Sequence, residues 1–454
     1  MANKLDVARQ YVLDNYNGGK DFRWDVLSRK LQMKAPQPPK GGEIRETPPL
    51  LGGGREGATW QEVDKRKINT IACNCATETG VSVSAMEVLT VLHSEDIPSV
   101  NPLREYLLSL PEYTPGNQSF IDWLSAQVKI KDPNPEPFPS KGKREETPLP
   151  LREGTGVGLV WQHCFKKWFV AMVASWLYDD VVNQQVLVLI GKQGIYKTTW
   201  LEHLMPPCLR AYQTKMTNVR DLNKDERLRI AEFGLINIDE IDSMNDRELN
   251  QLKSLVTTSD VNERAAYSYT KERRIRIASF CASGNNREFL TDQTGNRRWL
   301  PFDVEMIDSP YNWGNSFPYE QIYGEAMYLI KNGFNYWFDL DDISTLENHV
   351  ESFQKVSNEA ELLPVYFQPA NPGDNGAEFM SAAEISSLLV SYGNIRQPLP
   401  INKLGSLLQK AGYQQRRVNG KRGYTVCVVS DITNQRKLDA RSAEDSSASS
   451  ATFF

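Results

Sequence analysis

The chain has 454 residues, a net charge of −5 and an apolar fraction of 40%. This length allows two or three domains with real cores, and the slightly acidic balance means that any contact with nucleic acid must depend on local basic patches. Four histidines and six scattered cysteines argue against a zinc site and favour free thiols in a reducing compartment.

The first residues, MANKLDVARQYVLDNY, are polar and amphipathic, so no secretion signal is expected. No apolar run approaches the roughly 20 residues that a membrane-spanning helix requires. We therefore expect a cytoplasmic protein without membrane contact.

Residues 1–157 are predicted to form a helical N-terminal region with two insertions. Apolar residues recur at helical spacing between Val81 and Leu92. Residues 35–58 and 132–156 are rich in proline, glycine and charge, so both are expected to be disordered. The two segments share Lys-Gly, Glu-Thr-Pro and Arg-Glu-Gly in the same order, which favours a repeated insertion over a functional motif.

The segment QVLVLIGKQGIYKTTW, residues 185–200, predicts a strand, a glycine loop and the start of a helix. Backbone N–H groups of such a loop can point at phosphate oxygens, where the helix dipole favours negative charge. We expect Lys197 to contact the β- and γ-phosphates of ATP and the Thr198 hydroxyl to ligate Mg²⁺. The predicted ATP-binding residues are Gly191, Gln193, Gly194, Ile195, Tyr196, Lys197, Thr198 and Thr199.

Tyr196 departs from the pattern G-x-x-x-x-G-K-[ST], in which glycine stands directly before the lysine. A tyrosine there must follow a backbone path that is normally left to glycine. The alternative interpretation of this loop is a strand, turn and helix that happen to contain a lysine.

A second apolar strand, residues 235–238, leads into Asp239 and Glu240. Magnesium-dependent hydrolysis needs one carboxylate to hold the water shell of the metal and another to polarise the attacking water. A strand end capped by solvated acids is the simpler alternative.

A third strand, residues 274–284, ends in Asn285 and Asn286, and a tight turn beyond it presents Arg297 and Arg298. The loop, the acidic strand end, the amide strand end and the arginine pair thus follow one another in order. Together these motifs indicate a nucleotide-hydrolysing domain more strongly than any one of them alone.

The series GKQGIYKTT, INIDEID, LKSLVTTSDVNERAAY, ASGNN and TGNRRWLPF resembles the ATPase domain of the virulence-associated protein E family. These mobile-element proteins are related to superfamily 3 helicases and poxvirus-type primase–helicases. The resemblance covers about residues 20–310. It implies an α/β fold with a P-loop ATPase core of the AAA+-like, superfamily 3 helicase type, which we place at residues 158–345.

The resemblance also implies roles for individual residues. Asp239 would bind Mg²⁺ together with Thr198, and Glu240 would act as general base. Asn286 would be the sensor that positions water near the γ-phosphate, with Asn285 as the alternative. The implied catalytic residues are Lys197, Asp239, Glu240, Asn286, Arg297 and Arg298.

Oligomeric and DNA contacts are implied in the same way. Arg297 or Arg298 would complete the site of a neighbouring subunit, so the family resemblance implies a homo-oligomeric ring, most simply a hexamer. Lys253 and Arg264 would face a central DNA channel.

Residues 346–430 are predicted to form a C-terminal winged helix. A capping box at Ser381 opens one helix, a second helix stops at Gly412, and Asn419-Gly420 joins two β-rich segments in the preferred hairpin turn. The tail, residues 431–454, is polar and expected to be disordered.

The predicted winged helix has a local basic bias, with seven basic and no acidic residues between positions 395 and 430. Phosphate contact requires such a bias, although a solvated basic face on a packing domain is the alternative. The predicted DNA-binding residues are Lys253, Arg264, Lys403, Arg416, Arg417, Lys421 and Arg422.

These features together predict an ATP-dependent DNA helicase or motor of a mobile-element or phage replication system. Its ligands would be ATP, Mg²⁺ and single-stranded or forked DNA, and any priming activity would reside on a separate polypeptide. Two alternatives stay open, namely an ATP-binding initiator or switch with little turnover and a defence-related NTPase.

Overall fold

The computed structural model describes residues 3–35, 60–131, 157–216, 224–263, 272–290, 296–309, 317–354, 357–393, 395 and 398–429. The chain divides into two compact units, Met1–Gln354 and Lys355–Phe454. The predicted insertion at 132–156 and the tail at 431–454 lie outside the described residues, as does the insertion at 35–58 apart from Ala35.

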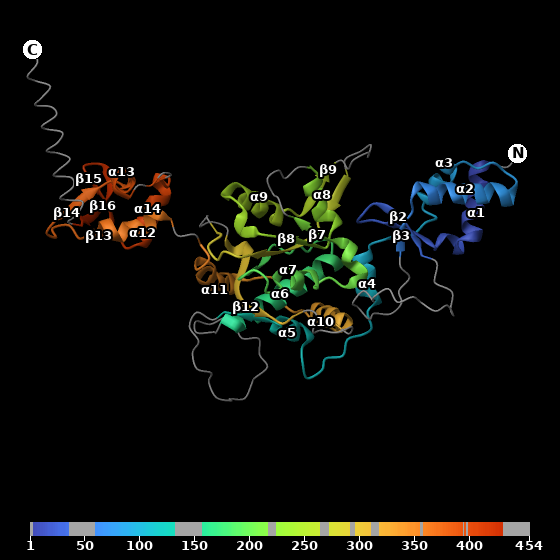
Figure 1. Cartoon of the computed structure of the whole chain (residues 1–454), viewed down its shortest axis with the longest axis horizontal. Helices are drawn as coiled ribbons and strands as arrows, with labels where there is room; N and C mark the ends of the chain where they lie inside the picture. The colour runs from blue at the N-terminus through green and yellow to red at the C-terminus, as the bar shows by residue number, and fades with distance from the viewer. Residues whose placement is uncertain are drawn as a thin grey trace, which may run out of the picture. The chain divides into compact units, whose positions relative to one another are not determined.

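The N-terminal part of the first unit combines helices with a small sheet (Figure 1). The sheet has four strands in the order β3-β2-β1-β4. Its strands have two to five residues each, which is too short for a clear period in the sequence. The elements are α1 (Lys4–Asn15), η1 (Asn17–Gly19), β1 (Phe22–Asp25), β2 (Lys30–Lys34), β3 (Trp60–Glu62), α2 (Lys65–Thr79), α3 (Ala85–Leu92) and β4 (Ser99–Val100).

A six-stranded sheet forms the centre of the first unit, with the strand order β5-β12-β6-β11-β8-β7. Every neighbouring pair is parallel except β5 with β12. The strands are β5 (Val128–Ile130), β6 (Val186–Ile190), β7 (Gln213–Met216), β8 (Leu235–Ile238), β11 (Ser279–Gly284) and β12 (Trp299–Ile307). α-Helices stand between most consecutive strands of this sheet, so the predicted mixed α/β fold is confirmed.

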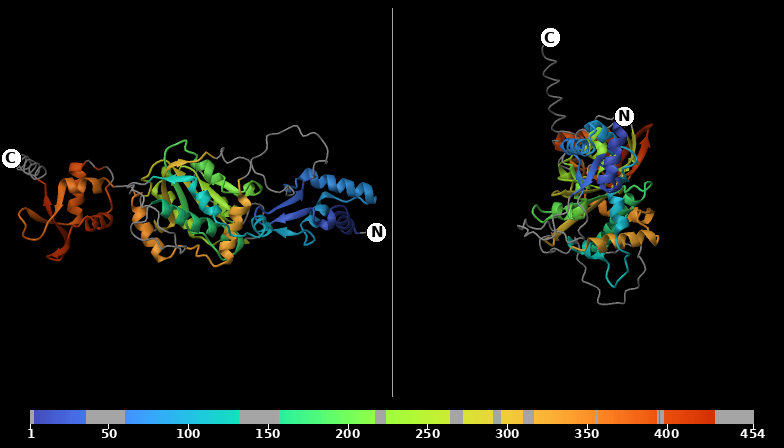
Figure 2. Two further views of the ribbon diagram at one scale, coloured as in Figure 1. Left: turned by 90° about the horizontal axis from the view of Figure 1, so that it is seen from below. Right: turned by 90° about the vertical axis from the view of Figure 1, so that its right-hand side faces the viewer.

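Helices cover both faces of this sheet (Figure 2). Leu187 and Leu189 of β6 pack on one side, and Val186, Val188 and Ile190 pack on the other. A parallel strand buried on both faces reads as a continuous apolar run, which explains the sequence at 186–190. The helices are α4 (Pro102–Ser109), α5 (Phe120–Ala126), α6 (Val157–Leu177), α7 (Lys197–Glu202) and α10 (Tyr319–Lys331) on the first side, and α8 (Lys224–Glu232) and α9 (Asp246–Thr257) on the second.

Shorter elements complete the first unit: η2 (Pro207–Tyr212), η3 (Ile241–Ser243), β9 (Asp260–Glu263), β10 (Glu272–Ile275), η4 (Asn296–Arg298) and α11 (Leu340–Glu351). Leu346 and Val350 of α11 are buried in the cores that flank the central sheet. The predicted domain boundary at 345/346 falls inside this helix, and the two units divide after Gln354. No helix within the described ranges is long and apolar enough to cross a bilayer.

The second unit contains three helices and a small antiparallel sheet. Its elements are α12 (Asn358–Tyr366), β13 (Phe367–Pro369), β14 (Ala377–Met380), α13 (Ala382–Gly393), α14 (Ile401–Lys410), β15 (Gln415–Val418) and β16 (Lys421–Val428). The predicted capping box is confirmed, because the Glu384 carboxylate accepts from the Ser381 N–H at 2.7 Å and the Glu384 N–H donates to the Ser381 hydroxyl at 3.3 Å.

The predicted hairpin of the second unit is also confirmed. β15 and β16 pair antiparallel on either side of Asn419 and Gly420. Both turn residues have positive φ, 50° and 79°, as a type I′ turn requires.

Candidate active site

The glycine loop (residues 191–196) connects β6 to α7, as the sequence predicts. A Cβ atom on Gly191 would lie 2.6 Å from the carbonyl oxygen of Val304, so only glycine allows β12 to approach the start of the loop. At the other end of the loop, Tyr196 adopts φ 67° and ψ 17° and directly precedes α7. The tyrosine therefore follows the left-handed path that glycine usually takes at this position.

We expect Tyr196→Gly to raise the free energy of unfolding. Relief of the left-handed backbone strain should stabilise the folded state by about 1–2 kcal/mol. The greater conformational freedom of glycine stabilises the unfolded chain and offsets about 0.5–1 kcal/mol of this gain. Tyr196→Ala is the matched control, because it removes the ring but keeps the strain. Urea unfolding of both variants tests this, and a Tyr196→Gly protein less stable than Tyr196→Ala would contradict it.

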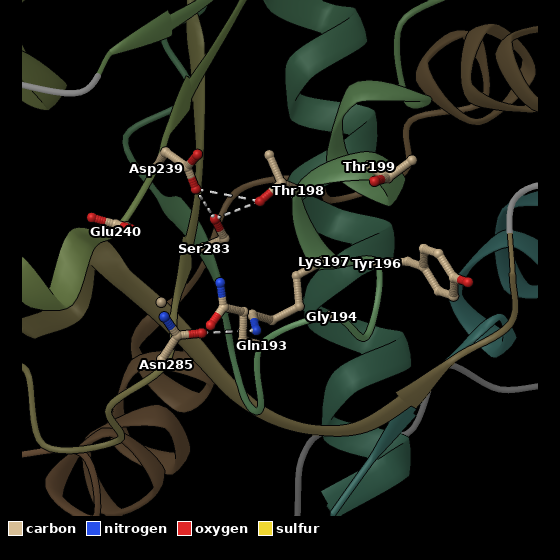
Figure 3. Close-up of a pocket in the computed structure, with 11 residues that line it drawn as sticks. Gln193, Gly194, Tyr196, Lys197, Thr198, Thr199, Asp239, Glu240, Ser283 and Asn285 are labelled. Carbon is tan, nitrogen blue, oxygen red and sulfur yellow. Dashed lines mark hydrogen bonds between the residues drawn. The ribbon is translucent and has the colours of Figure 1, made fainter.

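A pocket of about 330 Å³ opens beside the glycine loop (Figure 3). It lies where β8 and β11 end, so three neighbouring parallel strands direct their carboxyl ends to it. Of the predicted ATP-binding residues, only Gly191 and Ile195 do not line it; Ile195 instead packs against the core. The lining residues are Gln193, Gly194, Tyr196, Lys197, Thr198, Thr199, Asp239, Glu240, Ser283, Gly284 and Asn285.

Lys197 is 7% exposed, and its ammonium group lies inside the curve of the glycine loop. It donates hydrogen bonds to the carbonyl oxygens of Gly191 and Lys192, each at 2.7 Å, and to Asn285 Oδ1 at 3.3 Å. Burial lowers the pKa of Lys197, and the carboxylates of Asp242 and Asp239 oppose that change. A positive charge is thus held at the base of the pocket.

Three side-chain oxygens meet on the opposite side of the pocket (Figure 3). Asp239 Oδ1 accepts from Ser283 Oγ at 2.8 Å and from Thr198 Oγ1 at 3.3 Å, and the two hydroxyl oxygens are 3.1 Å apart. Carboxylate and hydroxyl oxygens are the donors that Mg²⁺ prefers, so this set fits that ion. Ser283 was not predicted, although it stands in the ASGNN segment at the end of β11.

Three further polar residues follow β8 and β11, and two of them, Glu240 and Asn285, line the pocket. Glu240 is exposed, has a φ of 54° and lines the pocket. Asn285 also lines the pocket and accepts from Lys197, whereas Asn286 Oδ1 accepts from the Glu288 N–H at 3.0 Å. The structure therefore brings Asn285, the alternative in the sequence prediction, to the pocket, and it does not bring the Asn286 side chain there.

Arg297 and Arg298 lie near the amino ends of the parallel strands, whereas the pocket lies at the carboxyl ends. They end η4, and the next residue, Trp299, pairs with Val186 at the start of β6. The glycine loop follows Ile190 at the other end of the same strand, and a five-residue strand spans roughly 15 Å. The two arginines do not line the pocket of their own chain.

Lys253 lies on α9 and is buried, with 8% of its surface exposed. A lysine packed this way offers little surface to a DNA backbone. The sequence could not reveal this, because the burial of Lys253 depends on how α9 packs within the fold. Arg264 lies outside the described residues.

Four of the predicted DNA-binding residues of the second unit are exposed, namely Lys403, Arg417, Lys421 and Arg422. Arg416 is half-buried, and its guanidinium lies 5.4 Å from the centre of the Phe379 ring. Arg417 and Arg422 are cross-strand partners in the β15–β16 hairpin.

Residues 154–355 match the family model of the virulence-associated protein E-like domain. No curated protein matches the chain. Solved structures of the NrS-1 C-terminal region are similar to it. Two A-form apo structures of that region are each 10% identical to this chain, with a TM-score of 0.41. The first match covers 94% of this chain and 100% of the solved chain, and the second covers 93% and 98%. A further apo structure shares 11% identity at a TM-score of 0.38, covering 94% of this chain and 100% of the other. The family resemblance is thus confirmed, and the chain contains a virulence-associated protein E-like domain.

Proposed function

We propose that this chain is a magnesium-dependent P-loop ATPase that acts as a DNA helicase in the replication of a mobile element. One observation carries the proposal: Lys197, Thr198 and Asp239 meet around a single pocket at the carboxyl ends of parallel strands. A buried cation beside a cluster of hard oxygen donors is suited to a metal-bound polyphosphate. The family of the 154–355 domain supports the mobile-element setting.

Each pocket residue has a chemical task in this proposal. Lys197 would exchange its contacts with loop carbonyls for contacts with the β- and γ-phosphates. Thr198 and Asp239, with Ser283 beside them, would hold Mg²⁺, which when bound neutralises charge on the phosphates. Glu240 would accept the proton of the attacking water, and the Asn285 amide would orient that water.

A nucleotide-dependent switch with little turnover is the second candidate. Tyr196 favours it, because a bulky side chain stands in the loop where the usual pattern has glycine. ATP turnover measured with and without single-stranded DNA, followed by strand displacement on a forked duplex, separates the two functions. Tight ATP binding without DNA-stimulated turnover would reject the helicase and support the switch.

We further propose that the subunits form a ring, in the simplest case a hexamer. Support comes from Arg297 and Arg298, which lie at the end of the sheet remote from their own pocket. In a ring they would reach the pocket of another subunit. The mass of the assembly in the presence of ATP and Mg²⁺ tests this. A monomer at all protein concentrations would contradict the ring.

The second unit is proposed to be a winged helix that binds DNA through phosphate contacts. The helix pair α13 and α14, followed by the β15–β16 hairpin, supports the fold, and the exposed basic residues of α14 and the hairpin support the contact. Contacts of this kind give affinity with little sequence preference.

Replacing Arg416, Arg417, Lys421 and Arg422 together by alanine is expected to weaken DNA binding and flatten its salt dependence. Each lost phosphate contact should lower the slope of log K against log salt by about 1. Titrations of labelled DNA at several salt concentrations measure this. Basal ATPase without DNA should persist, because its proposed site lies in the first unit. Unchanged affinity and slope would show that the basic face is only solvated.

A further inference from the structure

We propose that Asp242 is a positioning residue that fixes the loop carrying Asn285 against Lys197. The inference rests on the proposed ATPase function and assigns a task to a carboxylate that does not line the pocket. Asp242 lies in η3, two residues after Glu240.

A hydrogen bond joins Asp242 to the amide end of the neighbouring strand. Asp242 Oδ2 accepts from the backbone N–H of Asn286 at 2.9 Å. The preceding residue, Asn285, is the one whose side-chain oxygen accepts from Lys197. One carboxylate thus ties the segment after β8 to the segment after β11, directly beside the residue that would face the γ-phosphate.

The Asp242 carboxylate also lies close to Gly284, at the end of β11. A Cβ atom on Gly284 would lie 2.8 Å from Asp242 Oδ1 and 2.8 Å from Ile190 Cδ1. A side chain at position 284 would therefore displace the Asp242 carboxylate or the Ile190 methyl group from its present place. Asp242 Oδ1 is buried and has no hydrogen-bond partner among the described residues.

An unpaired buried carboxylate oxygen is unfavourable for folding, since a buried acceptor without a partner has lost its hydrogen bonds to water without replacing them. This arrangement is understandable if the carboxylate serves the site. Its charge also acts on Lys197, where it opposes the fall in pKa that burial causes. Asp242 therefore influences the two groups that meet in the Lys197–Asn285 hydrogen bond.

A double-mutant cycle tests the proposal. In the full chain, Asp242→Ala should lower kcat for ATP by about 10–100-fold with little change in KM, because a displaced catalytic group loses rate rather than affinity. Asn285→Ala should lower kcat similarly. The double variant should be no slower than Asn285→Ala alone, because Asp242 acts through the loop that carries that residue. Losses that multiply in the double variant would overturn the inference.

Asp242→Asn tests whether the hydrogen bond to the Asn286 N–H carries the effect. The asparagine keeps an acceptor oxygen for the Asn286 N–H, so it should recover most of the kcat lost in Asp242→Ala. A kcat as low as that of the alanine variant would count against positioning through this hydrogen bond. If Asp242→Ala does not fold, Asp242→Ser takes its place in the cycle.

Two further variants, Asp246→Ala and Lys197→Ala, distinguish failure of this inference from failure of the proposed ATPase function. Asp246→Ala removes an equivalent charge from the exposed first turn of α9, and its kcat should stay within about twofold of wild type. Wild-type hydrolysis in Lys197→Ala would overturn the ATPase site and this inference together. Loss of hydrolysis in Lys197→Ala combined with independent effects of Asp242 and Asn285 would overturn this inference alone.

Discussion

Replacement of Lys197 by alanine is expected to abolish ATP turnover and to weaken nucleotide binding by about 10–100-fold, the equivalent of a lost charged hydrogen bond of about 1.5–3 kcal/mol. The ammonium group is buried at the base of the pocket, where its contact with phosphate is strengthened by limited access of water. Titration with a fluorescent ATP analogue and a phosphate-release assay measure the two effects.

Lys192→Ala is the matched control for that experiment. Lys192 stands on the same glycine loop, but its side chain is exposed and does not line the pocket. The variant keeps the backbone carbonyl that accepts from Lys197. We therefore expect near-normal binding and turnover in Lys192→Ala, and equal losses in the two variants would reject a specific role for Lys197.

Glu240→Gln is expected to keep ATP binding and to lose about 10²–10⁴-fold in hydrolysis rate, the usual contribution of a general base. The amide has the shape of the carboxylate but cannot accept a proton from water. Asp239 and its two hydroxyl neighbours are untouched, so metal-dependent nucleotide binding should persist. Single-turnover hydrolysis with equilibrium binding on the same samples gives the comparison.

Glu288→Gln serves as the control for Glu240→Gln, because Glu288 is an exposed acid beyond β11 that does not line the pocket. Its hydrolysis rate should match that of the wild type. Loss of ATP binding in Glu240→Gln, in step with loss of hydrolysis, would instead indicate that Glu240 supports the strand end.

The order of motifs in the sequence predicts much of the site, because parallel strands bring their carboxyl ends to one edge of a sheet. Lys197, Thr198 and Asp239 are found together for this reason. The choice between Asn285 and Asn286 depends on where β11 ends and how the chain turns there, and the sequence does not specify that turn. The role of Ser283 was missed because serine is common at strand ends.

Long-range packing limited the other predictions. The approach of Asp242 to Gly284 depends on two strands lying side by side, which no local pattern of residues encodes. The burial of Lys253 depends on how α9 sits against the sheet. In the second unit the signals are local, namely a capping box and a two-residue turn, and both were predicted correctly.

The parallel pairing of β6 and β12 has a consequence for symmetry. It places the pocket at one end of the sheet and Arg297 and Arg298 at the other, so the two proposed contact surfaces of a subunit are different patches. An interface that joins one to the other is heterologous, and repetition of it either closes a ring or continues as an open helix. A two-fold dimer would pair like patches and leave each pocket without the arginines of its neighbour.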